Sequence, residues 1–154
     1  GMGGGSTICA AEVQHRLFRL GLPVTAQSDG LLVRMMAAAV AKHDVVVALS
    51  LGGYTQDVVE SAAIARQYGA KVVAITPAGT PLAAQADALL PLVVHENDYI
   101  YKPSTSRYAM LAMVDVLATS LAVANKRQSR DRLRRIKLAL DSHRGGADRQ
   151  PLGD

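Results

Sequence analysis

The chain alternates short apolar runs with longer stretches in which apolar residues recur at helical spacing. The short runs are rich in branched aliphatic residues, which predicts strands at 45–49, 71–75 and 88–94. The longer stretches predict helices over 6–20, 30–41, 56–68, 104–124 and 129–142, with one helical turn over 82–86. Because strands that alternate with helices form βαβ units, we predict an α/β fold with a parallel sheet between two layers of helices.

Glycine, proline and aspartate mark the ends of the predicted elements. Gly21 ends the first helix and Gly69 the third, and Asp29 is placed to cap the second. The run 45–49 is apolar throughout, which is typical of a strand buried on both faces. Pro91 has no N–H to donate to a neighbouring strand, so it places the third strand at the edge of the sheet.

Parallel sheets bind ligands outside the carboxyl ends of their strands, which here are followed by the loops 50–55 and 76–80. The loop 3–6, before the first helix, is predicted to lie at the same edge. The Gly3-Gly4-Gly5-Ser6-Thr7 segment offers backbone freedom and hydroxyl groups at the start of a helix.

The loop 50–55 has the composition of a phosphate cradle. Gly52 and Gly53 allow a sharp turn and a close approach of the backbone to a ligand, and Ser50 and Thr55 offer hydroxyl donors. The following helix points free N–H groups at the same place. We interpret the loop as an anion site that uses neither a lysine nor a metal; the alternative is that Gly and Ser serve the turn geometry alone.

Two other phosphate-binding motifs fit less well. A mononucleotide loop requires a lysine after its glycine run, and no lysine follows any glycine run here. A dinucleotide loop requires a preceding strand and an acid at the end of the next strand. Gly1, Gly3 and Ser6 match that motif only in part, and the candidate acid Asp29 has a sufficient role as a helix cap.

Composition bounds the class of protein. The 154 residues suit one domain, over 1–144, and we expect 145–154 to be a disordered tail. No apolar run reaches the ~18 residues of a membrane helix without Arg, Lys, Asp or Gln, so we expect neither a membrane span nor a secretory signal. Cys9 is the single cysteine, so an internal disulfide is excluded and a reducing, cytoplasmic location is favoured. We expect Cys9 to be a buried thiol. One cysteine and four scattered histidines give no zinc site, and we expect no metal and no cofactor.

The net charge of +4 is local. Seven of the 17 basic residues lie between Lys126 and Lys137 beside one acidic residue. This run is either a nucleic-acid patch or a solvated helix that packs on the domain or its partner. The absence of aromatic residues and the apolar stripe Leu133, Ile136 and Leu140, expected to face inward, favour the second interpretation. The Met- and Ala-rich stretches 35–41 and 110–124 are interpreted as core or dimer interface.

The strand and loop Val45-Val46-Val47-Ala48-Leu49-Ser50-Leu51-Gly52-Gly53-Tyr54-Thr55 resemble the S-x-S-G-x-T phosphosugar loop of the SIS (sugar isomerase) domain. Gly4-Gly5-Ser6 is similar to the end of that family's first G-x-G-x-S loop. Further matches are the segments 15–21, 68–76, 81–83, 86–87 and 106–107. Together with 133–144, these segments look most like the effector domain of RpiR-type transcriptional regulators.

The resemblance implies a five-stranded parallel sheet of flavodoxin-like order, whose first strand would be missing from this chain. It also implies a homodimer or homotetramer that senses a sugar phosphate, and an upstream helix-turn-helix domain through which DNA is bound. Gly1-Met2 ahead of the glycine run is typical of an expression scar or a chosen start site, so we expect the natural chain to continue upstream.

The resemblance also assigns ligand-binding residues. The family's phosphate-binding hydroxyls fall on Ser6, Ser50 and Thr55, and the second loop serine is replaced by Gly52. The first glycine of the first loop falls on Met2. The predicted sugar-phosphate site comprises Gly4, Gly5, Ser6, Ser50, Gly52, Gly53, Thr55, Glu96, Ser106 and Arg107.

One alternative is a domain that has lost ligand binding and acts only in dimerisation, because Gly52 removes a hydroxyl donor. Another is an aldose–ketose isomerase, which requires a placed base. The candidates are Glu12, His15, His95, Glu96 and Asp98, all interpreted first as solvated polar groups, so we assign no catalytic residue. Glu96 is expected to contact sugar hydroxyls. Ser106 and Arg107 begin a helix that faces the pocket or a neighbouring subunit, where Arg107 pairs with the carboxylate of an acid sugar or caps a dimer contact.

Overall fold

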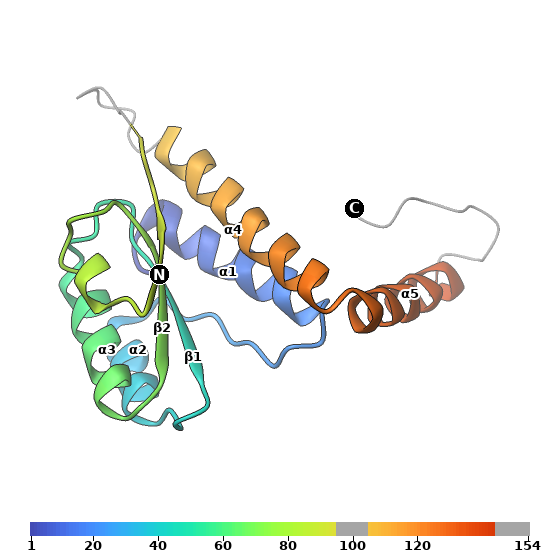
Figure 1. Cartoon of the computed structure of the whole chain (residues 1–154), viewed down its shortest axis with the longest axis horizontal. Coiled ribbons are helices and arrows are strands. Elements are labelled where there is room, and N and C mark those ends of the chain that lie inside the picture. Colours follow the sequence, from blue (N-terminus) through green and yellow to red (C-terminus); the bar gives the residue numbers. More distant parts are fainter. Residues whose placement is uncertain (95–104, 144–154) are drawn as a thin grey trace.

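Three parallel strands form the centre of the computed structural model, which describes residues 1–94 and 105–143 (Figure 1). The strands are β1 (Val45–Leu49), β2 (Lys71–Thr76) and β3 (Ala88–Pro91). The helices are α1 (Gly4–Phe18), α2 (Gly30–Ala38), α3 (Gln56–Gln67), α4 (Thr105–Ala124) and α5 (Lys126–His143), with a 3-10 turn, η1, at Ala83–Gln85. The predicted elements are therefore all present; β1 has its predicted bounds, and the others differ at one or both ends.

The strands are ordered β1-β2-β3, and both pairs are parallel. The register pairs Val45 with Lys71 and Val73 with Ala88. β3 lies at an edge of the three-stranded sheet, as predicted, but it ends at Pro91 and is shorter than the predicted 88–94. The parallel sheet of the predicted α/β fold is confirmed.

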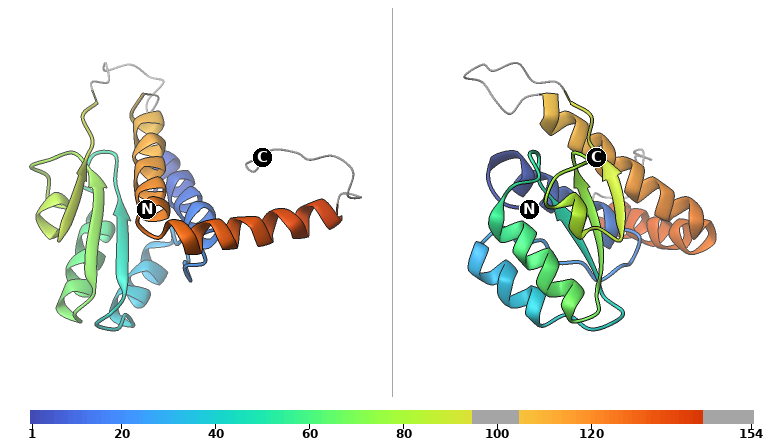
Figure 2. Two further views of the ribbon diagram at one scale, coloured as in Figure 1. Left: turned by 45° about the vertical axis from the view of Figure 1, so that its right-hand side comes forward. Right: turned by 60° about the vertical axis from the view of Figure 1, so that its left-hand side comes forward.

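Helices cover both faces of the sheet (Figure 2). On one face, Leu49 and Ile75 pack with Cys9 and Val13 of α1 and with Met110 of α4. On the other face, the alternate strand residues pack with α3, and α2 packs on the outside of α3. Because successive strand side chains point to opposite faces, one apolar strand supplies both halves of the core.

Burial of β1 increases along its length. Val45 is 57% exposed, whereas Leu49 is 1% exposed. The prediction of a strand buried on both faces therefore holds at the carboxyl end, where Ala48 and Leu49 contact different clusters. This end also begins the loop 50–55.

The predicted boundary residues act as expected. The Asp29 carboxylate accepts a hydrogen bond from the Leu32 N–H at 2.8 Å and caps α2. Gly21 and Gly69 follow α1 and α3 with φ of 78° and 93°, which are left-handed conformations that favour glycine.

Helix α4 bears on the expectation that the chain has no membrane span. It is long and apolar enough to cross a membrane by length and composition, although Arg107 and Asp115 lie within it. Asp115 accepts a hydrogen bond from Arg16 of α1, and the Met110 and Val114 side chains lie in the core. Core helices of soluble proteins can have the same length and apolar composition, so α4 is only weak evidence for a membrane span.

Helix α5 projects away from the sheet, in the direction opposite to α2 and α3 (Figures 1 and 2). Ser129 is its buried residue, and Arg132 donates to the Leu20 carbonyl at 3.2 Å and to the Gly21 carbonyl. The expectation that Leu133, Ile136 and Leu140 face inward is wrong for Leu140, which is 44% exposed because the helix extends past α1. The predicted tail, 145–154, lies outside the described residues.

Candidate functional site

The loop 50–55 connects β1 to α3 and is closed by its own hydroxyl groups. Ser50 is 2% exposed, and its backbone N–H donates to the Ile75 carbonyl at 3.2 Å, which extends the β1–β2 pairing by one residue. Its Oγ accepts the Gly53 N–H at 2.9 Å and lies 3.3 Å from Thr55 Oγ1. Ser50 is therefore held at the point where the strand ends and the turn begins.

These contacts leave hydroxyl protons available at the loop. Ser50 Oγ already accepts from Gly53, so its own proton goes to Thr55 or to a ligand. Thr55 is the N-cap residue of α3, but its side chain makes no capping hydrogen bond. The first N–H groups of this 12-residue helix therefore lie beside two hydroxyls, an arrangement that suits an anion.

One acidic residue lies in the first turn of α3 and is balanced by an arginine. Asp57 lies 4.0 Å from Arg34 of α2, which also binds Glu60. This pairing reduces the repulsion that the Asp57 carboxylate exerts on an anion at the helix start.

A second loop fixes the conformation of the first. Gly53 has φ of 76°, and a Cβ at that position would overlap the Thr80 side chain. The Gly53 carbonyl accepts the Leu82 N–H at 3.1 Å, and Thr80 Oγ1 donates to the Pro77 carbonyl at 2.9 Å. The loops after β1 and β2 therefore interlock at Gly53, where no larger residue fits.

Gly52 differs from Gly53 in both respects. Its φ is outside the left-handed region, and a Cβ there would meet no atom of the described residues within 4 Å. Neither backbone conformation nor space requires glycine at this position.

The starts of α1 and α4 meet the loop from the other side. A Cβ on the buried Gly5 would lie 3.2 Å from Leu51 Cδ1 and 3.5 Å from Arg107 Cγ. Gly4 opens α1, and Ser6 is 5% exposed within its first turn. The structure thus brings three predicted segments together, through Gly5, the loop 50–55 and Arg107.

Ser106 and Arg107 open α4 near this junction. Ser106 is buried, and the Arg107 guanidinium carbon lies 5.2 Å from the centre of the Tyr108 ring. Among the described residues, Arg107 is a cation whose side-chain stem approaches Gly5 at the start of α1. Glu96, the remaining predicted ligand residue, lies outside the described residues.

The sequence interpretation placed the loop 76–80 at the ligand edge but assigned no role to the threonines at its two ends. Thr80 locks Gly53, and Thr76, at the carboxyl end of β2, is fully buried with no hydrogen-bond partner for its Oγ1 among the described residues. The strand register could have indicated Thr76. Leu49 pairs with Ile75, so the next residues of the two strands, Ser50 and Thr76, lie side by side.

The described candidates for a catalytic base are placed on the outer part of α1. Glu12 lies 3.9 Å from Arg16, and His15 is exposed. Cys9 is fully buried, and burial raises the pKa of its thiol, an effect that nearby Arg107 opposes and Glu12 reinforces. His95 and Asp98 lie outside the described residues. Within residues 1–94 and 105–143, no group of three or more His, Cys, Asp or Glu side chains is arranged to hold a metal.

The sequence profile of the SIS domain matches residues 2–120. The HTH-type transcriptional regulator HexR of Pseudomonas aeruginosa is 40% identical over 137 residues, covering 89% of this chain and 48% of that protein. The chain spans about half the length of the curated HexR relatives that it matches.

Two solved structures share the fold at 26% identity. The NanR protein of Vibrio vulnificus, solved in complex with ManNAc-6P, superposes with a TM-score of 0.81 over 90% of this chain and 54% of NanR. The sugar isomerase domain of an RpiR transcription factor from Sphaerobacter thermophilus superposes with a TM-score of 0.76 over 88% of this chain and 74% of that domain chain. These similarities agree with the parallel sheet and its flanking helices.

Proposed function

The chain belongs to the SIS domain family, and from that premise we propose that it is the sugar-phosphate-sensing effector domain of an RpiR-type transcriptional regulator. Its identity to HexR over nearly the whole chain supports the regulatory role, and the sugar phosphate bound to NanR supports the ligand class. Because the chain spans about half of its curated relatives, we propose that a helix-turn-helix domain upstream binds DNA.

The main support for sugar-phosphate binding is the geometry of the loop 50–55. A buried Ser50 hydroxyl, a Thr55 hydroxyl 3.3 Å away and the start of α3 offer donors to a phosphate without a lysine. The interlock at Gly53 holds these donors in place before a ligand arrives.

Three further features belong to the proposal. The complete domain would have a five-stranded parallel sheet, whose first strand would precede this chain. A homodimer or homotetramer would cover apolar side chains that are otherwise exposed, such as Tyr108, Val116 and Val123 of α4 and Leu31 and Met35 of α2, which are 51–71% exposed. The regulatory role implies a cytoplasmic location.

Arg107 supplies the cation of the proposed site. Its side-chain stem lies against Gly5, which supports a role for the guanidinium in pairing with a second anionic group, the carboxylate of an acid sugar. The alternative role, a cap on a dimer contact, predicts that Arg107→Gln changes the oligomeric state and leaves ligand preference unchanged.

A thermal-shift screen tests the function. The ligands are hexose 6-phosphates, pentose 5-phosphates, ManNAc-6P and acid-sugar phosphates, with inorganic phosphate as the non-sugar control. A ligand that binds the folded state raises the melting temperature by mass action. Ser50→Ala should reduce that shift, whereas Ser28→Ala, at an exposed position, should keep it. An unchanged shift in Ser50→Ala would show that the ligand binds elsewhere.

A further inference from the structure

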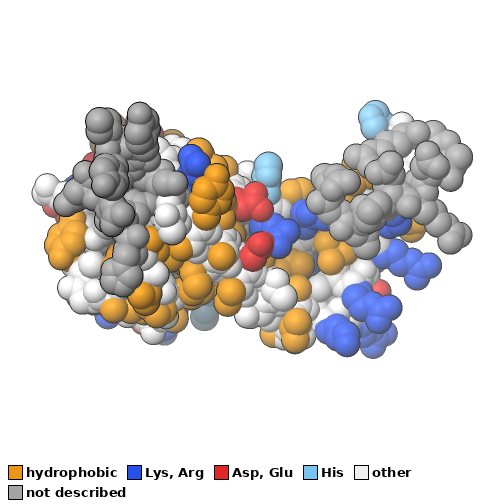
Figure 3. Space-filling view, turned by 90° about the horizontal axis from the view of Figure 1, so that it is seen from above, with side chains coloured by type: hydrophobic (Ala, Val, Ile, Leu, Met, Phe, Trp, Pro, Cys, Tyr) orange, Lys and Arg blue, Asp and Glu red, His pale blue; other side chains and the backbone are white. Residues whose placement is uncertain are grey.

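Helix α5 carries a concentrated positive charge. Seven Lys or Arg side chains and two Asp side chains give its 18 residues a charge of +5. In residues 1–94 and 105–125, basic and acidic residues balance. Figure 3 shows blue side chains gathered on the projecting part of the molecule, away from the sheet.

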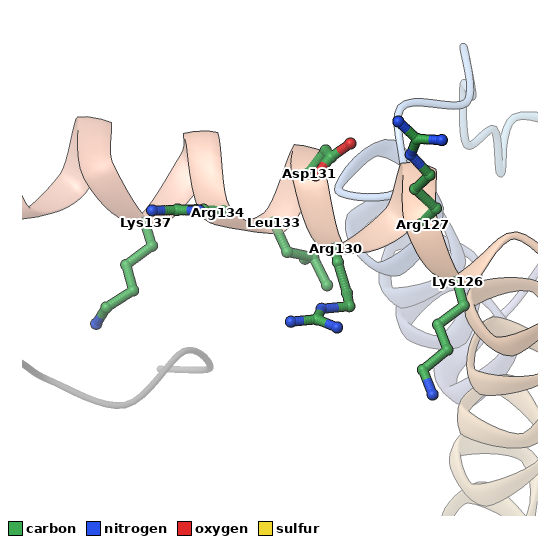
Figure 4. Close-up of a pocket in the computed structure, with 7 residues that line it drawn as sticks. All are labelled: Lys126, Arg127, Arg130, Asp131, Leu133, Arg134 and Lys137. Atoms are coloured by element: carbon green, nitrogen blue, oxygen red, sulfur yellow. The ribbon is translucent and has the colours of Figure 1, made fainter.

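Four of these cations share one stripe of the helix, and Arg127 lies beside it. Lys126, Arg130, Arg134 and Lys137 are spaced by four, four and three residues, which places them on one helical stripe beside Arg127. These five residues, the cationic face, line a groove of about 590 Å³ together with Asp131 and Leu133. Lys126, Arg130 and Lys137 extend toward the same side (Figure 4). The stripe is about 16 Å long at 1.5 Å per residue.

The cationic face opposes the stability of its own helix. Its first turn has no acidic residue, and Lys126 and Arg127 lie at the end where the helix dipole disfavours cations. Arg130 stands four residues from both Lys126 and Arg134, so like charges adjoin. A bound polyanion would remove these repulsions.

Packing on the domain does not account for the charge. Arg132 is the α5 cation that binds the α1 end, and it lies outside the cationic face. Lys137 pairs with Asp141 at 3.8 Å along the same helix. The apolar stripe of this helix favoured packing on its own domain, but α5 projects away from the domain. Packing of α5 on a second α5 is disfavoured as well, because two helices of the same charge repel each other.

We propose that the cationic face of α5 binds the phosphate backbone of duplex DNA without reading base sequence. Duplex DNA carries one negative charge per ~1.7 Å of its axis, so a 16 Å stripe meets several phosphates. Nucleic-acid single strands are bound by aromatic stacking, and residues 126–143 contain no aromatic side chain. The proposal goes beyond sugar-phosphate sensing and does not depend on it.

Fluorescence anisotropy of the whole chain with a labelled duplex of arbitrary sequence tests the proposal. Each neutralised phosphate contributes a slope of about −0.9 in log affinity against log salt, so five contacts give about −4.5, a loss of ~500-fold between 50 and 200 mM salt. We expect salt-dependent binding that is equal for a second, unrelated duplex. No binding at 50 mM salt would overturn the proposal.

Matched variants separate the cationic face from net charge. Lys126→Gln/Arg130→Gln should weaken binding roughly tenfold or more at 50 mM salt and reduce the slope by about 1.8. Arg19→Gln/Lys42→Gln removes the same charge outside α5 and should retain affinity. Equal losses in both variants would overturn the proposal. Circular dichroism checks that helix content is kept, and the sugar-phosphate thermal shift should be the same in both variants.

Discussion

Restoring the missing hydroxyl at position 52 should strengthen ligand binding. The loop 50–55 offers hydroxyls at Ser50 and Thr55, while the S-x-S-G-x-T pattern has a third at the position of Gly52. A Cβ on Gly52 meets nothing within 4 Å among the described residues, and its φ is acceptable to any residue. Gly52→Ser therefore adds a donor without a clash.

The size of the effect follows from one additional hydrogen bond to a charged group. Such a bond is worth about 1.5–3 kcal/mol net. Since 1.4 kcal/mol corresponds to tenfold, the affinity for the responding sugar phosphate should rise roughly 10- to 100-fold. The gain should appear mainly for phosphorylated ligands and vanish for the unphosphorylated sugar, because the added hydroxyl would stand in the loop that we propose holds the phosphate.

Isothermal titration calorimetry with the sugar phosphate of largest thermal shift measures this gain. Gly52→Ala is the control, because it adds the Cβ and restricts the unfolded chain without supplying a donor. We expect Gly52→Ala to bind like the parent and Gly52→Ser to bind more tightly. Equal affinities for all three would refute the assignment of position 52 to the phosphate.

Three further predictions concern stability. Gly53→Ala should lower the free energy of unfolding by about 2 kcal/mol or more, since left-handed φ costs ~1–2 kcal/mol for a non-glycine residue and Thr80 blocks the Cβ. Urea titration measures this loss, with Gly52→Ala as the control. Equal urea midpoints for the two variants would contradict the interlock. Asp29→Ala should lower the free energy of unfolding by about 1 kcal/mol through loss of the α2 cap, whereas Ser28→Ala should change it little. Similar losses in both variants would show that the effect is not specific to the Asp29 cap. The Val72 N–H, then the Lys71 ammonium, hold the pKa of Asp87 below its ordinary value, so the stabilisation from Asp87 is present at neutral pH and lost as pH falls through the folded pKa. Asp87→Asn should therefore be less stable than the parent at pH 7, with a difference that shrinks below about pH 4, and a constant difference would exclude this linkage.

The elements and their order were predictable because their signals are local. Short runs of branched aliphatic residues gave β1 and β2, and the glycines after α1 and α3 have the left-handed φ that their positions implied. The start of α1 was predicted two residues late, because Gly4 and Gly5 are poor helix formers. Glycine nevertheless suits this position, since an added Cβ would lie tightly against Leu51 and Arg107.

The placement of the last two helices was not predictable from their composition. An apolar stripe has the same spacing whether it faces its own domain, another subunit or solvent. Val114 is buried and Val116, two residues on, is 51% exposed, although both are apolar and lie on one helix. In α5 the turn at Asn125 sets the direction of the helix, and that turn carries no distinguishing sequence signal.

Gly52 and Gly53 show where inference from a motif stops. As a pair they indicate a flexible turn, and the sequence alone treats both as backbone requirements. The structure separates them, because Thr80, 27 positions from Gly53, fills the space that a Cβ at Gly53 would need, while the space around Gly52 is open. A contact between residues so distant in sequence leaves no trace in the local pattern. The absent hydroxyl at position 52 is therefore a property of the side chain alone, which one substitution can reverse without disturbing the loop.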